Sequence, residues 1–174
     1  MTELNVTHWI DYGTLLGALR YEHILMWDHD ADVSFDRKFA YLLHNGGKAQ
    51  KIAKERYNML LNAAVLVYEG VQADVYSWDK ISIDGGGFKY TKSVNRKFDL
   101  FEEYVNDFNA SFIDKTVSIP FAGGYVSAPY PPMEFIKARY PKSYNKALPY
   151  KISCYFPWNI KHWLIDNRPI HKII

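Results

Sequence analysis

The sequence predicts one α+β domain in which β-hairpins and helices follow one another along the chain. Residues 65–76 and 116–129 each contain two short apolar stretches separated by turn residues, the pattern of a hairpin. Residues 48–64 carry apolar side chains at helical spacing, and 132–140 begin with proline, which a first helical turn tolerates. At 174 residues the chain is long enough for one sizeable core, so 1–174 is treated as a single domain.

The chain is expected to begin with a strand over 8–11, a tight turn at Gly13 and Thr14, and a short helix over 15–20. A glycine turn at the N-terminus of a helix leaves backbone N–H groups open to a phosphate group. Thr14 is equally suited to be the N-cap of this helix, a role that is compatible with phosphate binding. The segment is therefore a candidate phosphate-binding turn.

Three aspartates, Asp28, Asp30 and Asp32, alternate with other residues in the next segment. In a strand their side chains would share one face, about 7 Å apart. Two like charges at that separation repel by roughly 2 kcal/mol at an effective dielectric constant of about 20. Because no neighbouring residue on that face neutralises them, the spacing indicates a site for a divalent cation.

Two other interpretations fit the same spacing. A calcium-binding helix-loop-helix motif opens with the same three aspartates, but it requires glycine at its sixth position and an acid at its twelfth. Val33 and Phe39 occupy these positions, which argues against a calcium loop. The second alternative, an acidic edge strand whose charges discourage pairing with another chain, stays open on these residues alone.

A further acid, Asp74, lies in the second arm of the first predicted hairpin. Alternation places Gln72, Asp74 and Tyr76 on one face of this arm and the apolar residues between them on the other. An acid in the middle of a strand is costly to bury unless it has a partner. The pattern alone leaves Asp74 equally open to a position on an exposed edge.

The remaining elements follow from local patterns. The glycine-rich segment 84–87 is a flexible turn that lacks the Lys-Ser/Thr ending of a phosphate loop. Pro120 limits the first arm of the second hairpin to a sheet edge. A short helix or turn is expected over 36–43, a strand over 88–94 and a helix over 98–108.

Composition and charge exclude several classes of protein. The single cysteine, Cys154, rules out an intrachain disulfide framework and a cysteine-rich zinc site. The longest apolar run, 63–68, is too short to cross a bilayer, so no membrane span is expected, and the first thirty residues show no signal peptide. The net charge is +2 and the basic residues form no dense stripe, so no nucleic-acid partner is expected.

Two segments resemble the signature of a known family. Residues 9–20 read Trp-Ile-Asp-Tyr-Gly-Thr-Leu-Leu-Gly-Ala-Leu-Arg and residues 27–33 read Trp-Asp-His-Asp-Ala-Asp-Val, which closely resembles the LicD family. This family includes bacterial phosphocholine transferases and, in animals, fukutin and the fukutin-related protein. The run 132–140 resembles the family's second conserved block, although Pro141 stands where the family usually has glycine. The resemblance covers about 10–150.

This resemblance implies a nucleotidyltransferase-like fold, with a mixed β-sheet flanked by helices. It implies transfer of a phosphorylated alcohol, such as phosphocholine or ribitol phosphate, from a CDP-linked donor to a sugar hydroxyl of a glycan, with Mg²⁺ or Mn²⁺. Family members usually have a helix before the first motif, so an N-terminal helix is expected to be missing here. The expected compartment is the cytoplasm for a bacterial or complete protein and the Golgi lumen for an excised animal domain.

The resemblance also implies catalytic and metal-binding roles for the acids. Asp30 and Asp32 are expected to hold the metal ion. Asp74, as the acid on an adjoining strand, is expected to complete the metal site, to take the proton from the attacking hydroxyl, or both. Asp28 is a further candidate metal ligand.

The first motif supplies the candidate residues for the donor phosphates. Gly13 and Thr14 are expected to cradle these phosphates, and Arg20 to neutralise their charge. Alternatively, Arg20 forms a surface pair with Glu22 or Asp11.

Two rival functions use the same residue types. A nucleotidyltransferase that moves the nucleotide itself to a small acceptor shares the glycine turn and the acid pair, but it releases pyrophosphate where a phospho-alcohol transferase releases CMP. A catalytically inactive binding module of the same fold would bind nucleotide without requiring a metal. The run 15–20 and the tryptophan before Asp28 favour the phospho-alcohol transferase.

Overall fold

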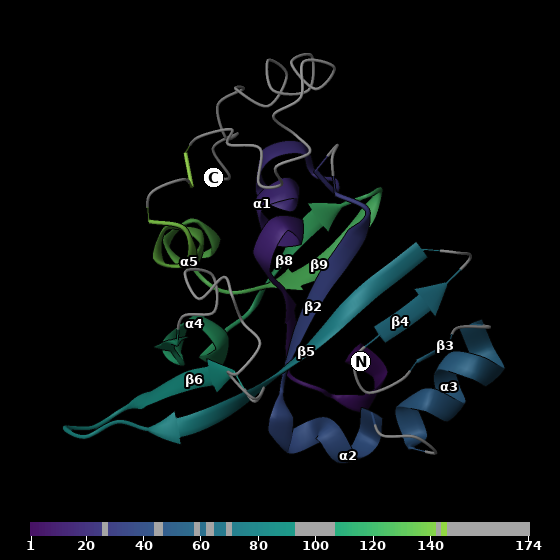
Figure 1. Cartoon of the computed structure of the whole chain (residues 1–174), viewed down its shortest axis with the longest axis horizontal. Coiled ribbons are helices and arrows are strands. Elements are labelled where there is room, and N and C mark those ends of the chain that lie inside the picture. Colours follow the sequence, from purple (N-terminus) through teal and green to yellow (C-terminus); the bar gives the residue numbers. More distant parts are fainter. Residues whose placement is uncertain are drawn as a thin grey trace.

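The computed structural model shows a curled, mixed β-sheet with helices on both faces and a separate two-stranded hairpin (Figure 1). It confirms the α+β class and the mixed sheet flanked by helices. The structure describes residues 1–25, 28–43, 47–57, 60–61, 65–68, 71–92, 107–141 and 144–145. The segments around Gly13, Asp30 and Asp74 lie within these ranges, whereas Trp27 of the second motif lies outside them.

The main sheet is built around one parallel pair of strands. Its strands run in the order β1 (His8–Ile10), β2 (Asp30–Asp36), β5 (Val71–Ser82), β4 (Val65–Tyr68) and β3 (Leu60–Leu61). β2 and β5 are parallel, whereas the other neighbours in this order are antiparallel. The far half of β5 pairs with β6 (Phe88–Lys92), which in turn pairs with β7 (Phe108–Asn109). The long strand β5 therefore joins two parts of the sheet.

Helices cover both faces of this sheet. One side carries α1 (Tyr12–Tyr21), α4 (Ser111–Asp114), α5 (Pro132–Arg139) and the hairpin formed by β8 (Val117–Phe121) and β9 (Gly124–Ala128) (Figure 1). The other side carries the 3₁₀-helices η1 (Thr2–Leu4) and η2 (Arg37–Phe39), with α2 (Ala40–Leu43) and α3 (Lys48–Tyr57). None of the helices in the described ranges combines the length and the apolar character that a membrane span requires.

The two faces of the sheet support different cores because side chains alternate along each strand. Phe35 of β2 and Val75 of β5 pack with buried residues of α2 and α3. On the opposite face, Trp9 of β1 and Trp78 of β5 pack with Phe135 of α5 and with the apolar side of α1. The aspartates of β2 and Asp74 of β5 share this second face, beside α1.

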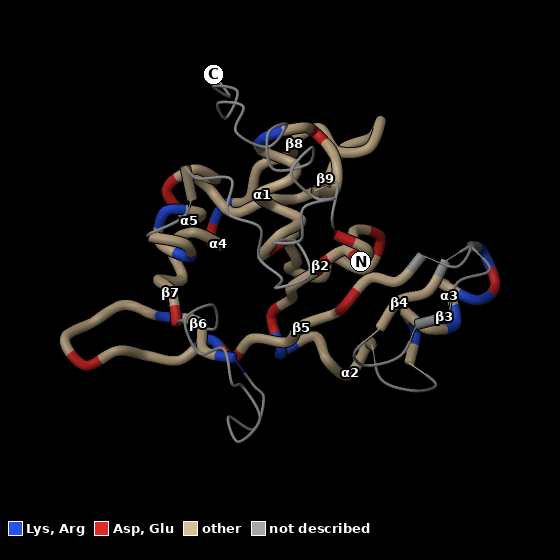
Figure 2. The backbone as a smooth tube through the Cα atoms, turned by 45° about the horizontal axis from the view of Figure 1, so that its top comes forward, with Lys and Arg blue, Asp and Glu red and all other residues tan. Residues whose placement is uncertain are grey.

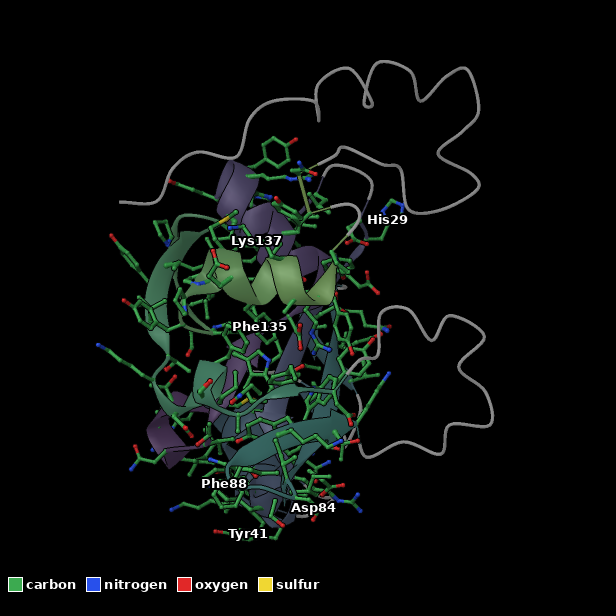
Figure 3. All side chains as sticks on the ribbon, turned by 90° about the vertical axis from the view of Figure 1, so that its left-hand side faces the viewer. His29, Tyr41, Asp84, Phe88, Phe135 and Lys137 are labelled. Atoms are coloured by element: carbon green, nitrogen blue, oxygen red, sulfur yellow. The ribbon has the colours of Figure 1, made fainter. Side chains whose placement is uncertain are left out.

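Helix α5 has a buried side and an exposed side. Phe135 lies on the side that faces the sheet and Lys137 on the outer side (Figure 3). Arg139 is buried with Phe135, whereas the ammonium group of Lys137 pairs with Glu134 at 2.7 Å on the exposed side. One helix therefore contributes a buried cation and a solvated cation.

The start of α1 differs from the prediction. The helix begins at Tyr12, so Gly13 and Thr14 lie in its first turn and not in a tight turn before it. The reason is that the Asp11 carboxylate accepts a hydrogen bond from the Tyr12 N–H at 2.9 Å and caps the helix. Thr14 is therefore not the N-cap.

Three further boundaries needed correction. β2 begins at Asp30, so Asp28 precedes the strand and the three aspartates do not all lie on it. The predicted helix 48–64 ends at Tyr57, because the following leucines pair with β4 as strand β3. Phe108 forms strand β7 with Asn109 and does not end a helix, and the rest of the predicted helix 98–108 lies almost wholly outside the described residues.

Other predicted elements are confirmed. The hairpin 65–76 is present as β4 and β5, and the hairpin 116–129 as β8 and β9. The helix expected to end before Pro141 is α5. The strand predicted over 88–94 is β6, with its last two residues outside the described ranges.

Candidate active site

Asp32 and Asp74 lie opposite each other on the parallel strands β2 and β5. Neighbouring strands are separated by about 4.8 Å, and register partners in a parallel pair point to the same face. The two carboxylates, 42 positions apart in the sequence, therefore share one site. Figure 2 shows the acidic positions of β2 and β5 side by side at the centre of the fold.

Asp30 belongs to the same row of side chains, one step closer to the end of the sheet. Its register partner on β5 is Gln72. Asp28 lies in the loop before β2, where its N–H donates to the Leu25 carbonyl at 2.9 Å. Asp28 therefore reaches the site from a loop and not from the strand.

The Asp28 carboxylate approaches the first turn of α1. A β-carbon on Gly13 would lie 2.5 Å from Asp28 Oδ2, which is closer than real β-carbons come to other atoms. Only glycine leaves room for this approach. The N-terminus of a helix carries partial positive charge, so an acid at this position is stabilised.

The electrostatic environment of Asp32 is strongly acidic. Burial, followed by the charges of four carboxylates, raises its pKa from 3.8 to about 8. Those carboxylates belong to Asp30, Asp11, Asp28 and Asp74, in decreasing order of effect. The four charges that raise the pKa of Asp32 are all negative, so the electrostatic environment of this carboxylate favours binding of a cation.

The donor chemistry of the site fits Mg²⁺ or Mn²⁺. Its candidate ligands are carboxylate oxygens, which are the ligands that hard divalent cations prefer. Within the described part of the chain, no three side chains of Asp, Glu, His or Cys are already gathered closely enough to hold one ion. The types of residue present at the site nevertheless fit such an ion.

The first turn of α1 is fastened to β2 through the peptide units of Asp32. The Asp32 N–H donates to the Thr14 hydroxyl at 2.7 Å. The Asp32 carbonyl accepts a hydrogen bond from the Asp11 N–H at 3.1 Å. These two bonds fix the predicted phosphate-binding turn beside the predicted metal ligand. Thr14 is fully buried, and its hydroxyl proton still has to be donated to another group.

The Asp74 carboxylate is oriented by its two neighbours on the same face of β5. Gln72 Nε2 donates to Asp74 Oδ1 at 2.8 Å, and the Tyr76 hydroxyl donates to Asp74 Oδ2 at 3.3 Å. Burial, with smaller contributions from the Asp32 and Asp74 charges, raises the pKa of Tyr76 above its ordinary value. The phenol therefore stays protonated and remains a donor to Asp74.

Arg20 lies at the other end of α1, in its last turn. Arg20 lies six positions after Thr14, which corresponds to about 9 Å along a helix axis. The Arg20 side chain is 4% exposed, and its Nη2 donates to the Tyr144 carbonyl at 3.1 Å. Its contact with donor phosphates stays a prediction.

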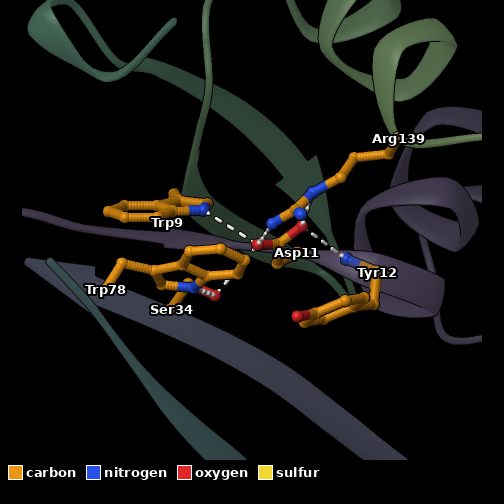
Figure 4. Close-up of polar contacts among 6 residues, drawn as sticks. All are labelled: Trp9, Asp11, Tyr12, Ser34, Trp78 and Arg139. Carbon is orange, nitrogen blue, oxygen red and sulfur yellow. Dashed lines mark hydrogen bonds and ion pairs between the residues drawn. The ribbon is translucent and has the colours of Figure 1, made fainter. Parts of the chain in front are cut away.

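A buried ion pair between Asp11 and Arg139 was not predicted from the sequence (Figure 4). Arg139 Nε donates to Asp11 Oδ1 at 3.2 Å and Arg139 Nη2 donates to Asp11 Oδ2 at 2.7 Å. Trp9 Nε1 and the Ser34 hydroxyl also donate to Asp11 Oδ2, at 3.2 and 3.0 Å. A single Asp before a helix signals an N-cap, but nothing local identifies a partner 128 positions away.

Aromatic rings surround the Arg139 guanidinium. Its Cζ lies 4.5 Å from the ring centre of Trp78, 4.6 Å from that of Phe108, 5.1 Å from that of Tyr12 and 5.2 Å from that of Phe135. Rings at these distances attract a cation through their electron-rich faces. The rings and Asp11 together compensate the burial of the charge.

Comparison with known proteins agrees with this geometry. Residues 5–131 match the family described as LicD/FKTN/FKRP, nucleotidyltransferase domain. The chain is 24% identical over 143 residues to the ribitol 5-phosphate transferase FKRP of Homo sapiens and, equally, to that of Mus musculus. Each alignment covers 78% of this chain and 28% of the relative, so the chain spans little more than a quarter of the length of these relatives.

The family match includes both segments that carry the candidate site. It contains α1 with its Gly13–Thr14 turn, the acids of β2 and the partner acid on β5, and it ends just before α5. Because it extends over more than half of the sequence, the chain belongs to the LicD/FKTN/FKRP nucleotidyltransferase domain family.

Proposed function

We propose that this protein transfers a phosphorylated alcohol from a CDP-linked donor to a sugar hydroxyl of a glycan. The observation that carries the proposal is the register of Asp32 with Asp74, beside the N-terminus of α1. This arrangement places an acidic site for a cation next to backbone N–H groups that suit a diphosphate. A cation site beside a diphosphate site is the combination that phosphoryl transfer requires, which supports the proposal.

Asp30, Asp32 and Asp74 would hold Mg²⁺ or Mn²⁺, with Asp28 close enough to the turn to join them. When bound, such an ion offsets the charge of the donor diphosphate and favours departure of the leaving group. Asp32 contributes most directly, because the surrounding carboxylates make its own negative charge unfavourable until a cation is present.

The first turn of α1 would bind the donor phosphates. Gly13 presents its backbone without a side chain, and the Thr14 hydroxyl has a proton to donate while it accepts from the Asp32 N–H. The partial positive charge of the helix N-terminus acts in the same direction. For Arg20 we retain charge neutralisation of the donor as a proposal, to be weighed against its observed bond to the Tyr144 carbonyl.

Asp74 would act as the general base. It takes the proton of the acceptor hydroxyl while the hydroxyl oxygen bonds to the phosphorus that bears the alcohol. The bond from that phosphorus to the bridging oxygen of the diphosphate breaks, and CMP leaves. Gln72 and Tyr76 hold the Asp74 carboxylate in a fixed orientation for this step. General-base catalysis of this kind contributes about 10²–10⁴-fold.

The alcohol belongs to the class of small polyols and amino alcohols. The two relatives named above are ribitol 5-phosphate transferases, which makes ribitol phosphate the first candidate for this chain. Phosphocholine is the second candidate, because bacterial members of the family that the motifs resemble transfer it.

The test is product analysis with purified protein. We expect CMP release from CDP-ribitol or CDP-choline in the presence of a glycan acceptor and Mg²⁺ or Mn²⁺, and loss of release with EDTA. Asp32→Asn should abolish it, whereas Asp79→Asn, a change on the neighbouring strand β5 that affects a surface pair with Arg37, should not. Pyrophosphate release from CTP would instead identify a nucleotidyltransferase, and metal-independent nucleotide binding without turnover would identify an inactive binding module.

A further inference from the structure

The turn that joins β1 to α1 contains a strained residue. Tyr12 has a φ of +48°, in the left-handed region, which large side chains rarely adopt. Asp11, the residue before it, is extended with a φ of −136°. Backbone conformations of this kind persist only where surrounding contacts enforce them, and they concentrate at functional sites.

Arg139 contacts both residues of this turn. Its guanidinium forms the two-point ion pair with Asp11, and its Cζ lies 5.1 Å from the centre of the Tyr12 ring. The same Asp11 carboxylate accepts the Tyr12 N–H at 2.9 Å, so Arg139 fixes the acceptor that holds the strained peptide. A two-point contact also fixes the plane of the carboxylate, which a single bond does not.

The turn leads directly to the candidate metal ligand. Asp11 donates its N–H to the Asp32 carbonyl, and Thr14, two residues after Tyr12, accepts the Asp32 N–H. Asp11 also accepts from the Ser34 hydroxyl, the next side chain on the same face of β2. A chain of short contacts thus runs from the guanidinium through the turn to both sides of Asp32.

Arg139 lies in the run 132–140, which resembles the family's second conserved block but follows the end of the family match. The match ends at residue 131, and α5 begins at Pro132. Its buried position is nevertheless well defined, with 2% of its side chain exposed and the Asp11 side chain completely buried. Without Arg139, the Asp11 carboxylate would be a buried negative charge with no positive charge from Arg139 to offset it. The Asp11 charge already helps to raise the pKa of Asp32.

We propose that Arg139 is a positioning residue, which acts through Asp11 to hold the strained turn at Tyr12 and thereby fixes Asp32 beside the N-terminus of α1. The positioning role stands on the described contacts alone. Only its consequence for donor binding rests on the proposed function.

Hydrogen exchange of backbone amides tests the positioning role without substrate or metal. The relevant amides are those of Asp11, Tyr12 and Asp32, whose bonds depend on the turn. The reference segments are helix α3, which packs on the opposite face of the sheet, and the hairpin of β8 and β9. The full chain is compared with Arg139→Gln, which removes the charge, and with Arg139→Lys, which keeps the charge but not the two-point contact.

We expect exchange of the turn amides and of Asp32 to accelerate at least about tenfold in Arg139→Gln, and less in Arg139→Lys, relative to the reference segments. Lys137→Gln is the matched control, because it removes a positive charge from the exposed side of the same helix. Exchange that accelerates equally in all segments, or that is unchanged at the turn, would overturn the positioning role. If Arg139→Gln does not fold, Arg139→Lys decides by the same criterion.

Binding of CDP with Mg²⁺, measured by calorimetry, separates this inference from the proposed function. Arg139→Lys should weaken binding about tenfold, and Lys137→Gln should leave it unchanged. If the unmodified protein does not bind CDP with Mg²⁺ at all, the proposed function fails, whereas the exchange experiment still decides whether Arg139 positions Asp32. If binding is equally tight in Arg139→Lys and in the unmodified protein, the contribution of Arg139 to the site is refuted.

Discussion

Asp32 and Asp74 face each other across the only parallel strand pair described in the main sheet, and each carboxylate has a different environment. Asp74 accepts hydrogen bonds from Gln72 and Tyr76, whereas Asp32 is surrounded by other acids. We therefore expect both to be required for transfer but to differ in their effect on stability.

Replacing Asp32 by Asn should abolish transfer and weaken binding of Mn²⁺, because a ligand charge is lost. The metal-free fold should become no less stable at neutral pH, because Asn is neutral without the proton that the Asp32 carboxyl group has to take up when the chain folds. Paramagnetic Mn²⁺ titration, with thermal unfolding in EDTA, checks both effects, and Asp79→Asn serves as the control on β5. Transfer that survives Asp32→Asn would contradict the metal role.

The stability of the metal-free protein should fall as the pH rises. The pKa of Asp32 is 3.8 ordinarily and about 8 in the fold, so between these values the folded chain binds a proton that the unfolded chain does not. Its contribution is fully present below about pH 4 and lost as the pH rises through about 8, and amounts to roughly 6 kcal/mol. Denaturant unfolding in EDTA across this range measures the slope.

Two comparisons identify the group responsible for that slope. In Asp32→Asn the unfolding free energy should depend much less on pH over the same window. Excess Mg²⁺ should restore stability at high pH in the unmodified chain, because a ligand that binds only the folded state stabilises it. Identical slopes in both proteins would show that Asp32 is not the titrating group.

Replacing Tyr76 by Phe should lower kcat several-fold and leave KM for the donor nearly unchanged. The substitution removes only the hydroxyl that donates to Asp74 Oδ2 at 3.3 Å, and the ring keeps its contact with Tyr12 at 5.2 Å between centres. Stability should change by no more than about 1 kcal/mol. Steady-state kinetics decides, and an unchanged kcat would show that orientation of Asp74 does not depend on Tyr76.

Replacement by Ala should have different effects at two glycines of α1, Gly13 and Gly17. At Gly17 a β-carbon would meet the His23 carbonyl and, at 2.9 Å, the Leu25 nitrogen. Because both are backbone atoms, the backbone must move, which should lower the unfolding free energy by about 1–3 kcal/mol. At Gly13 it would meet the Asp28 carboxylate, the movable end of a side chain. Gly13→Ala should therefore fold normally but bind metal and donor more weakly, as thermal unfolding and calorimetry would show.

Replacing Arg20 by Gln distinguishes a structural role from contact with the donor. The loss of the bond to the Tyr144 carbonyl should lower the unfolding free energy by about 1–3 kcal/mol, because a buried charged donor is involved. If Arg20 also neutralises the donor phosphates, as proposed above, KM for the donor should rise as well. A loss of stability with an unchanged KM would contradict that proposal and leave Arg20 a structural role alone.

The sequence allows much of this site to be predicted. Alternation in 71–76 placed Asp74 on a polar face, and the family resemblance placed that face beside Asp30 and Asp32. The register shows the adjacency directly. The start of α1 could not be predicted, because a tyrosine at φ +48° contradicts local preference and is enforced by distant residues.

The Asp11–Arg139 pair shows a second limit of sequence reasoning. Local patterns identified 132–140 as a helix, and they left open which of its cations is buried. Lys137 and Arg139 lie on different sides of the helix, and which side is buried is decided by packing against Trp78 and Phe108. Contacts between remote segments are fixed by tertiary structure and carry no local signature.

The alternation along β2 has a consequence for how the strand finds its partners. One side of it carries Asp30, Asp32, Ser34 and Asp36, and the opposite side carries Ala31, Val33 and Phe35. A shift of a single residue would exchange the sides, forcing carboxylates against α2 and α3 and leaving Phe35 in the acidic site. A misaligned pairing of β2 is thus unfavourable on both faces at once. The aspartates of the candidate site therefore also help to select the correct register when the sheet forms.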